Sequence, residues 1–494
     1  MELLSTIFKC YLIHGHVTRY LLLATLVPII KDKLGSISSS KNYRSIAISS
    51  LLLKMFDWII ILLFGDTFGL HDLQFVYQPG ISGNMCTYVV LETIDYFLRN
   101  RNEVFICTMD MPKAFDVTMH SLLFSKMLNA GLSAIYIRLL IFIYSEQFAN
   151  VRWNGTFSST FSLKNGVRQG AILSAIAYCF YCEKLFSLLE QRRSGCWKKG
   201  MFLGLFGYSD DNVCVAPSLI ALQDMLATCE EFAKSHNLRL STDPDPTKCK
   251  TKTVAFLKKP RPLPSLLLCG NPLPWADKFK HLGVNIENKI DGCEFDVKCK
   301  NAQFIGKCME LEQEFHYAHP SSKIKINQIY NSSFYGSPLW NLFGAGAHRL
   351  ESSYNRFVKN ALDLPYATHR AFIEPLSGSK LLKIILIQRF LGFLRKVDDS
   401  KKAALIMLKN EAINDVRSIT GKNCRNIMLY SGKSCIEEVL RCDMKNLAYH
   451  AMEVVDWWKV ELISELINIR SDCIEVPGLE IEAVEKMIEN VCTG

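Results

Sequence analysis

Two adjacent carboxylates, Asp210 and Asp211, stand between two runs of strand-forming residues in "LFGYSDDNVCVAP" (205–217). The aromatic and β-branched residues on either side favour extended backbone, so we predict a β-hairpin with both acids at its tip. Side by side the two charges repel each other, and no glycine eases the turn. A surface hairpin that carries solvated charges is the simpler interpretation of such a pair. A further carboxylate aimed at the same point would indicate a cation site instead.

The composition predicts a globular protein with a large core. The chain has 494 residues, of which 49% are hydrophobic and 21% are charged. These values suit two to four domains and exclude wholesale disorder. The formal net charge is +9 and the pI is about 8.7. A modestly basic protein of this kind suits a polyanionic partner such as nucleic acid.

The 18 cysteines are scattered singly along the chain, and only Cys179 and Cys182 form a C-x-x-C pair. Without a second pair or a nearby histidine this spacing does not predict a zinc site. We interpret the cysteines as small buried hydrophobes in a reducing compartment. The apolar runs at 20–30 and 58–65 are too short to span a bilayer, and no secretory signal is apparent. We therefore expect an intracellular protein of the nucleus or cytoplasm, without a membrane partner.

Strand and helix patterns alternate in the first half of the chain. "VFICTM" (104–109) predicts a short buried strand, and the helix that follows it should end at Gly131. Residues 218–237 have the apolar spacing of an amphipathic helix. The proline- and lysine-bearing "LKKPRPLP" (257–264) is the best candidate linker. Beyond residue 287 the pattern is mostly helical, and the alternation before it predicts an α/β or α+β fold.

The further carboxylate is Asp110, which directly follows the predicted strand 104–109. Open sheets present their ligands at the carboxyl edge of the strands, so Asp110 can face the Asp210–Asp211 hairpin across a cleft. Several carboxylates cannot share one place as free charges without raised pKa values. Two Mg²⁺ ions, roughly 3.5–4 Å apart, would neutralise them and serve an in-line phosphoryl displacement.

Three segments follow one another in fixed order: "CTMDMPKAFDVTMHSLLFSKM" (107–127), "NGVRQGAILSAIAYCFY" (165–181) and "GYSDDNV" (207–213). Together they resemble the successive palm motifs of reverse transcriptases, specifically those of non-LTR (LINE-type) retrotransposons. Other segments resemble the family's fingers, its next helix-loop element, its lysine-bearing motif and its thumb side: "LVPIIKDK", "NYRSIAISSLLLKMFD", "FVYQPGISGNMCTYVVLETIDYF", "TKCKTKTVAF", "LPWADKFKHLGVNI" and "SYNRFVKNALDLPYATHR". The match covers roughly residues 20–375, and so many motifs in order make it specific.

The resemblance implies an α+β right-hand polymerase fold. Fingers and palm would contain antiparallel sheet, whereas the thumb and the C-terminal region would be mostly helical. The expected domains are an N-terminal lead-in (1–24), fingers and palm (25–257), a thumb-like region (258–380) and a helical C-terminal region of unknown role (381–494).

The resemblance also implies roles for individual residues. Asp110, Asp210 and Asp211 match the metal-binding triad, which would hold two Mg²⁺ ions or, alternatively, Mn²⁺, with Asp211 as the more peripheral ligand. A lysine of "KCK" would donate to the leaving pyrophosphate. The register leaves Lys248 and Lys250 open, with Lys250 as the catalytic candidate. The expected substrate-binding residues are Lys31, Arg44, Phe115, Gln169, Gly170 and Tyr208.

Within that substrate-binding set, Lys31 and Arg44 would hold the triphosphate, where positive charge lowers the barrier to phosphoryl transfer. Phe115 would exclude a ribose 2′-hydroxyl, and an ordinary core phenylalanine explains this residue equally well. Gln169 and Gly170 would lie at a strand-to-helix turn against the nascent base pair, because glycine permits a close approach of the backbone.

Two further expectations concern nucleic acid, and both have a structural alternative. Arg168 is a candidate for contact with the template. Basic and aromatic residues of the thumb suit a grip on a duplex backbone, and helix faces with interleaved core aromatics explain them equally well; these residues are Trp340, Tyr354, Arg356 and Arg370. The chain departs from the family's usual residues at Ala171, Ala175, Ser209 and Asn212, none of which removes a catalytic group.

We therefore expect an RNA-directed DNA polymerase (reverse transcriptase) of a retrotransposon, which adds dNTPs to a primer 3′-hydroxyl by two-metal-ion nucleotidyl transfer. Its partners would be an RNA template, a DNA primer and dNTPs. An endonuclease function would have to come from elsewhere, since the chain starts just before the fingers. The alternative is a catalytically silent transposon remnant or a domesticated nucleic-acid-binding protein. A telomerase-like polymerase lacks support in the thumb-side motifs.

Overall fold

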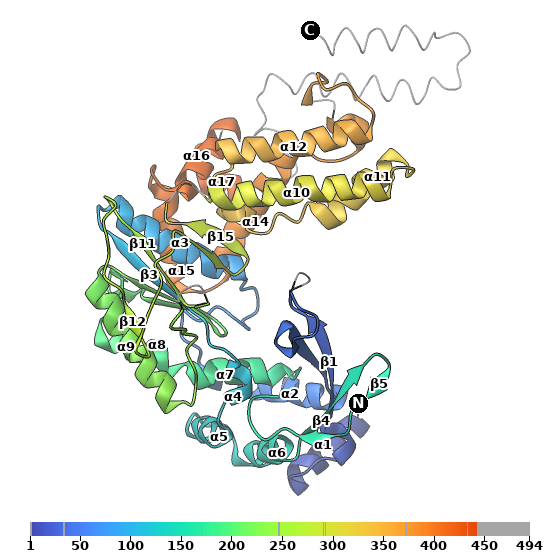
Figure 1. The fold of residues 1–494 in the computed structure, drawn as a ribbon, viewed down its shortest axis with the longest axis vertical. Coiled ribbons are helices and arrows are strands. Elements are labelled where there is room, and N and C mark those ends of the chain that lie inside the picture. The colour runs from blue at the N-terminus through green and yellow to red at the C-terminus, as the bar shows by residue number, and fades with distance from the viewer. Residues whose placement is uncertain are drawn as a thin grey trace. The chain divides into compact units, whose positions relative to one another are not determined.

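The structure is a computed structural model that describes residues 2–32, 35–168, 170–245, 248–289, 291, 293–370, 373–431 and 433–441 (Figure 1). The chain divides into two compact units. The first unit comprises residues 1–86 and 102–276, and the second comprises residues 87–101 and 277–494. The functional boundary drawn at residue 257 from the sequence stays a prediction. Residues 442–494 of the predicted C-terminal region 381–494 lie outside the described residues.

A four-stranded antiparallel sheet lies at the centre of the first unit. In the order β11-β3-β10-β9, its strands are Lys252–Phe256, Val104–Met109, Asp211–Ala216 and Leu205–Tyr208. β3 has the bounds predicted from "VFICTM" and is almost wholly buried. Helix α9 (Leu219–Ser235) packs on β3 and β10 (Figure 1). Its apolar stripe is buried as the spacing predicts. This packing fixes the register of the strands that carry the candidate acids.

A second sheet of the first unit joins segments far apart in the sequence. β1 (Leu23–Ile30) pairs antiparallel with β2 (Tyr43–Ile48) and parallel with β4 (Phe148–Trp153). β4 also pairs with β5 (Thr156–Phe157) and β6 (Phe161–Ser162). Residues 23–48 therefore form a strand, a loop and a second strand. The chain then enters helix α2 (Leu51–Phe64), which packs against α7 (Ile172–Cys182).

The remaining elements of the first unit surround these two sheets. Helix α5 is followed by Gly131 with φ +99°, the predicted stop signal. The helices are α1 (Glu2–His14), α2 (Leu51–Phe64), α4 (Ala114–Val117), α5 (His120–Asn129), α6 (Ala134–Ser145), α7 (Ile172–Cys182), α8 (Lys184–Arg192) and the 3₁₀ turns Arg19–Leu22, Ser40–Asn42 and Gly65–Phe68. The short strands are β7 (Trp197–Lys198), β8 (Met201–Phe202), β12 (Leu267–Leu268) and β13 (Asn271–Pro272).

Among the described residues, one helical stretch is apolar and long enough to cross a bilayer, namely residues 172–192. More than half of its most apolar window is buried inside the protein. This burial is typical of a core helix. Of the described cysteines, most are buried and none is bonded to another, which agrees with their interpretation as small hydrophobes.

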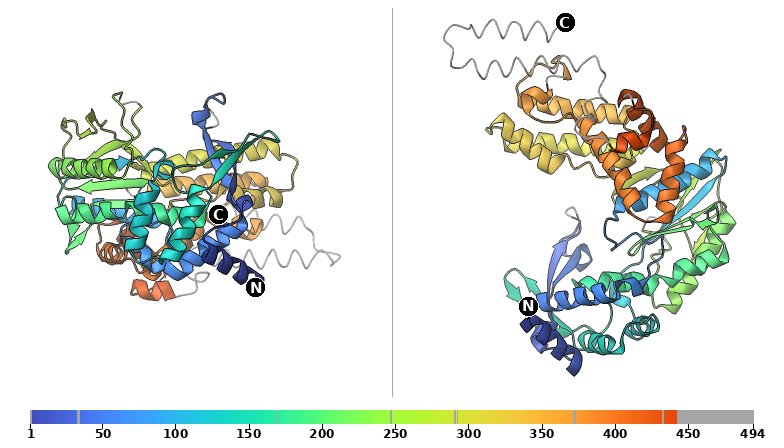
Figure 2. Two further views of the ribbon diagram at one scale, coloured as in Figure 1. Left: turned by 90° about the horizontal axis from the view of Figure 1, so that it is seen from below. Right: turned by 180° about the vertical axis from the view of Figure 1, so that it is seen from behind.

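The second unit is mainly helical and packs around one hairpin, β14 (Lys278–His281) with β15 (Val284–Glu287). The helices of this unit beyond residue 293 are yellow to orange-red in Figures 1 and 2, and the helix that contains residues 87–99 is blue. Neighbouring helices pack against one another. They are α10 (Glu294–Glu314), α11 (Pro320–Ile326), α12 (Ala345–Ala361), α13 (Ile373–Ser377), α14 (Leu382–Asp399), α15 (Ala403–Asn414), α16 (Ile419–Ser431), α17 (Ile436–Arg441), the short turns Asn327–Asn331 and Ser337–Leu339, and α3 (Gly83–Arg99), of which residues 87–99 belong to this unit.

Two aromatics expected to grip a duplex are instead core residues of the second unit. Trp340 and Tyr354 are both completely buried. The indole Nε1 of Trp340 donates to Asp296 Oδ2 at 2.9 Å, and the Tyr354 ring stacks on that of Phe304 with the ring centroids 6.0 Å apart. The grip predicted for these two aromatics is therefore wrong, because the sequence pattern does not show which helix face each ring occupies. Arg356 remains exposed.

A buried histidine in the second unit predicts acid sensitivity. His281 is 3% exposed, its Nδ1 lies 2.9 Å from Thr87 Oγ1, and burial lowers its pKa from 6.5 to about 4. A lowered pKa means that the unfolded chain binds a proton between these two pH values while the folded chain does not. The free energy of unfolding should therefore decrease, by about 3 kcal/mol, as the pH drops from about 6.5 to about 4. Urea unfolding of the wild type and of His281→Gln across this pH range measures the effect. If the free energy of unfolding of both proteins changed with pH in the same way, His281 would not be the cause of the acid sensitivity.

Candidate active site

The three candidate acids come from neighbouring strands of the central sheet. Asp110 directly follows β3, and Asp210 lies at the tip of the β9–β10 hairpin, where Asp211 begins β10. In the β10–β3 ladder Asn212 pairs with Met109, so the next step of this antiparallel register sets Asp211 opposite Asp110. The sheet therefore brings Asp110 beside two adjacent acids that lie about a hundred positions further along the chain.

Polar side chains hold the hairpin tip in a conformation that its own sequence does not favour. Ser209 has φ +65°, a left-handed backbone that L residues seldom adopt. Its amide donates to Gln74 Oε1 at 3.2 Å, and Gln74 is only 2% exposed. Asn212 Nδ2 donates to the Asp210 carbonyl at 3.3 Å. An apolar residue, the family's usual choice at position 212, could not make this last contact.

Gln74 is a functional candidate that the sequence did not single out. Its neighbour Phe75 donates its amide to Gly207 at 2.9 Å, and the Gly207 amide donates back to Leu73 at 3.0 Å. The segment 73–75 thus pairs with β9 and orients the acidic tip. Gln74 stands immediately before the motif that begins "FVYQPG", and nothing in its local pattern marks a glutamine that acts 135 residues further along the chain.

The electrostatics of the tip reflect crowding of negative charge. Burial, and then the Asp110 charge, raise the pKa of Asp210. Burial, and then the charges of Asp210 and Asp110, raise the pKa of Asp211 to about 6. Arg44 opposes both shifts by attraction, and Lys250 Nζ lies 3.8 Å from Asp110 Oδ2. Two cations therefore face three acids, and the site has a remaining attraction for positive charge.

The donor set fits a hard divalent cation. Asp110 Oδ2 is buried and accepts no hydrogen bond, so one lone-pair direction is left for another partner. Carboxylate oxygens with few other protein donors are what Mg²⁺ takes when substrate phosphates complete its shell. Among the described residues, no three acidic, histidine or cysteine side chains lie so that they could hold a metal ion. Any metal at the acids would need further oxygen ligands, such as substrate phosphates.

The structure separates the two lysines of "KCK". Lys250 lies nearest Asp110, as given above, while Lys248 pairs with Asp245 at 3.2 Å, and both lysine side chains are largely exposed. Lys250 is thus the one beside the acids, and its role in proton donation stays a prediction.

The two basic residues predicted for the fingers lie on one hairpin. Arg44 pairs across the β1–β2 ladder with Ile29, and Lys31 follows two residues after Ile29. Because side chains alternate along a strand, Lys31 and Arg44 project from the same face of this hairpin. Both are exposed. Arg44 is also near enough to attract Asp210 and Asp211.

Phe115 and Tyr208 lie on the palm side of the candidate site. Phe115 lies in α4 and is half-buried, and its ring packs on that of Tyr178 with the centroids 4.6 Å apart. Tyr208 ends β9 and pairs in register with Asp211. Neither residue is a fully buried core side chain, so both present surface to a ligand.

The turn at 165–170 is described except for Gln169, which lies outside the described residues. Gly170 has φ +75°, and a Cβ atom there would lie 2.3 Å from the carbonyl oxygen of Ala47. The close approach that requires glycine at this position is therefore an approach to the protein's own backbone. The expectation that Arg168 contacts the template is wrong, because Arg168 is 5% exposed and its Nη2 lies 2.7 Å from Asp57 Oδ2.

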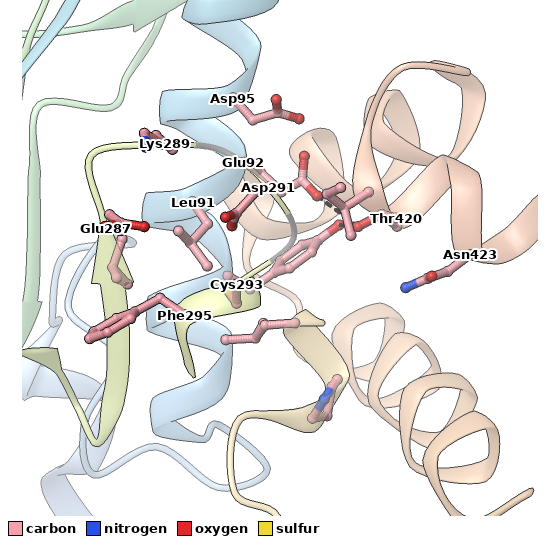
Figure 3. Close-up of a pocket in the computed structure, with 15 residues that line it drawn as sticks. Leu91, Glu92, Asp95, Glu287, Lys289, Asp291, Cys293, Phe295, Thr420 and Asn423 are labelled. Carbon is pink, nitrogen blue, oxygen red and sulfur yellow. Dashed lines mark hydrogen bonds between the residues drawn. The ribbon is translucent and has the colours of Figure 1, made fainter. Parts of the chain in front are cut away.

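A cavity of about 40 Å³ in the second unit is not a nucleotide site. It has room for a few water molecules, whereas ligand pockets measure roughly 300–1,000 Å³. Figure 3 shows Glu92, Asp95 and Asp291 around it, with Thr420 hydrogen-bonded to Glu92 at 2.7 Å. Its acidic lining also suits a triphosphate poorly.

Comparison with known sequences gives a family match over the same region. A sequence model described as "Reverse transcriptase (RNA-dependent DNA polymerase)" matches residues 30–286. The "Retrovirus-related Pol polyprotein from type-1 retrotransposable element R2" of Bradysia coprophila is 25% identical over 262 residues, which are 49% of this chain and 28% of that protein. The "Probable RNA-directed DNA polymerase from transposon X-element" of Drosophila melanogaster is 24% identical over 317 residues, 61% of this chain and 33% of that protein.

The chain spans about a third of the length of the curated relatives it matches. Among solved structures, a telomerase from Candida albicans in complex with a TWJ fragment of telomeric RNA aligns with a TM-score of 0.38 and 11% identity, covering 89% of this chain and 67% of that one. Apo telomerase from Candida tropicalis aligns with a TM-score of 0.37 and 12% identity, covering 91% of this chain and 73% of the other.

Proposed function

The chain belongs to the reverse transcriptase (RNA-dependent DNA polymerase) family, and from that premise we propose that it copies RNA into DNA as the polymerase of a non-LTR retrotransposon. The resemblance drawn from the motifs is thereby confirmed, as is the α+β fold class of right-hand polymerases. The reaction joins a primer 3′-hydroxyl to the α-phosphate of a dNTP and releases pyrophosphate. The retrotransposon assignment is supported by relatives whose names place them in such elements.

A single observation carries the proposal: Asp110, at the end of β3, lies opposite Asp211 beside the Asp210 tip. Burial and mutual repulsion raise the pKa values of Asp210 and Asp211. The charged forms of these carboxylates therefore do not stabilise the fold. Their presence on neighbouring strands of one sheet is accounted for by a bound divalent cation.

The acids would hold two Mg²⁺ ions, or Mn²⁺, together with the substrate phosphates. Such ions lower the pKa of an attacking hydroxyl and neutralise the charge that develops on phosphate. Lys250, beside Asp110, would donate a proton toward the leaving pyrophosphate, and Lys31 and Arg44 would hold the triphosphate from the fingers hairpin. Phe115 would lie under the sugar.

The substrates and partners follow from the family. They are an RNA template, a DNA primer and dNTPs, and a nuclease that nicks a target would be a separate activity. We propose that the protein acts in the nucleus or cytoplasm, to which its buried, unbonded cysteines are suited.

Primer extension tests this function. Purified chain is mixed with poly(rA)/oligo(dT), Mg²⁺ and labelled dTTP, and a parallel reaction omits the template. We expect template-dependent dTTP incorporation that stops when EDTA is added. A chain that binds the primer–template in a gel shift but incorporates nothing would instead be a silent remnant or a domesticated nucleic-acid-binding protein.

Phe115→Val is expected to weaken rejection of ribonucleotides. A smaller side chain under the sugar leaves room for a 2′-hydroxyl, and one pocket methylene or more changes discrimination by about 10- to 200-fold. The measurement is the ratio of kcat/KM for dTTP to that for UTP. Phe68→Val is the matched control, because Phe68 is 2% exposed and packs edge-on against Phe180 in the same unit. An equal ratio in all three proteins would make Phe115 an ordinary packing residue.

A further inference from the structure

The turn at 165–170 is held by residues on several other segments. His120 Nε2 donates to the Gly166 carbonyl at 2.7 Å, and the Val167 amide donates to the Phe115 carbonyl at 2.7 Å. The Gly166 amide also donates to Thr118 at 3.2 Å. These contacts tie the start of the turn to the segment that follows Asp110.

The end of the turn is held by one buried carboxylate of helix α2. Asp57 is 3% exposed, and its Oδ2 accepts from Arg168 Nη2 at 2.7 Å and from the Ile172 amide at 3.1 Å. Ile172 is the first residue of α7, where unpaired amides favour a negative charge. Asp57 thereby fixes the arginine of the turn and the start of the next helix together.

The same stretch of chain also touches the other side of the turn. Ser49 Oγ donates to the Gly170 carbonyl at 3.4 Å, and a Cβ atom at Gly170 would lie 2.3 Å from the Ala47 carbonyl oxygen. Residues 47–57 therefore contact both Arg168 and Gly170, the two neighbours of Gln169. A displacement of α2 would move both.

Stabilisation of the fold alone does not explain the buried Asp57–Arg168 ion pair well. Burial raises the pKa of Asp57 against the attraction of Arg168, and Arg168 Nε is buried with no hydrogen-bond partner. Replacing such a pair by apolar side chains of similar volume is often neutral or stabilising. A pair that contributes little to stability but joins two functional segments fits a role in geometry.

We propose that Asp57 is a positioning residue that acts through Arg168 to set Arg168 and Gly170 for binding of the incoming dNTP. This inference rests on the proposed function. The ion pair joins α2, next to the β1–β2 hairpin that carries Lys31 and Arg44, to the turn expected against the nascent pair. Loss of Asp57 should therefore weaken nucleotide binding more than it slows the chemical step.

The test compares Asp57→Asn with the double variant Asp57→Leu/Arg168→Met. Asp57→Asn should raise KM for dTTP about tenfold or more with kcat changed far less, since small displacements of a binding element are costly. The double variant removes both charges, so its melting temperature should return near the wild-type value while KM stays raised. The affinity for primer–template, measured without dNTP, should be the same in all proteins.

Ile60→Ala is the matched control, because Ile60 is completely buried on the same helix and its side chain carries no hydrogen-bonding group. It should lower the melting temperature and leave KM unchanged. If the wild type extends primers and the double variant recovers both stability and the wild-type KM, Asp57 is only structural and the positioning role is overturned. If the wild type extends no primer, the proposed function fails first, and the inference that rests on it fails with it.

Discussion

Asp210→Ala is expected to abolish template-dependent dTTP incorporation, with a loss on the order of a thousandfold or more. The variant removes one of three carboxylates that would hold the metal ions, and the loss of a single well-placed charge-stabilising group already costs about 10²–10³ in rate. Primer extension under single-turnover conditions measures it. Asp66→Ala is the control, because Asp66 is an exposed acid of the same unit in the turn after α2.

The same substitution should not destabilise the metal-free protein. Burial and the Asp110 charge raise the pKa of Asp210, so its ionised form is held at a cost in the folded state. Removing it relieves repulsion on Asp211, whose pKa is also raised. In EDTA the melting temperature of Asp210→Ala should equal or exceed that of the wild type. A lower value, with activity lost in proportion, would mean that Asp210 supports the fold and not the reaction.

Magnesium should reverse this order. An ion that binds only the folded protein raises its melting temperature in proportion to the logarithm of its concentration. With Mg²⁺ and primer–template present, the wild type should gain stability and Asp210→Ala should not. Asp211→Ala should fall between them, since Asp211 is more exposed than Asp110 and Asp210.

The elements that the sequence predicted well are those defined by a local pattern. The run "VFICTM" is apolar except for Thr108, and it forms β3 with the predicted bounds. The acids between strand-forming runs form the tip of a hairpin, and β10 pairs with β3 so that Asp110 comes beside them. Periodicity and turn chemistry suffice for such features because each depends on neighbours in the chain.

The features that the sequence missed depend on partners far along the chain. Gln74 supports the hairpin tip from 135 residues away, and Asp57 neutralises Arg168 from 111 residues away. A lone arginine beside a glycine turn looks like a ligand for nucleic acid, because the sequence does not show a buried acid that will meet it. Trp340 and Tyr354 were misjudged for a related reason: spacing defines a helix face but not what covers it.

The division into units could not be predicted either. A sequence-based boundary assumes that each domain is one continuous segment, whereas residues 87–101 belong with 277–494. The carboxyl-terminal part of α3 is buried there through contacts such as that of Thr87 with His281, 194 residues later. The pattern along the chain does not show that an early segment packs with a unit formed mainly by much later residues.

Gly170→Ala is expected to have the second large effect, on both stability and activity. Its φ of +75° is costly for any residue with a Cβ, and this Cβ would lie 2.3 Å from the Ala47 carbonyl oxygen, which cannot move without shifting β2. We expect a loss of about 3 kcal/mol in folding free energy. Displacement of the turn should also lower kcat/KM for dTTP by about a hundredfold at a temperature where the variant is folded. Urea unfolding and steady-state primer extension measure the two effects.

Gly155→Ala separates strain from overlap. Gly155 has φ +82° in the connection between β4 and β5, and nothing lies within 4 Å of the position of its Cβ. The free energy of unfolding of Gly155→Ala should therefore fall only by the cost of the backbone conformation, about 1–2 kcal/mol. Its kcat/KM should equal that of the wild type. Gly170→Ala could behave like Gly155→Ala in both measurements. In that case β2 would have shifted to make room for the methyl group without an effect on stability or activity. The close approach of the fingers strand to the turn would then have no part in nucleotide binding, because a shift of Ala47 large enough to admit a methyl group would have left the reaction untouched.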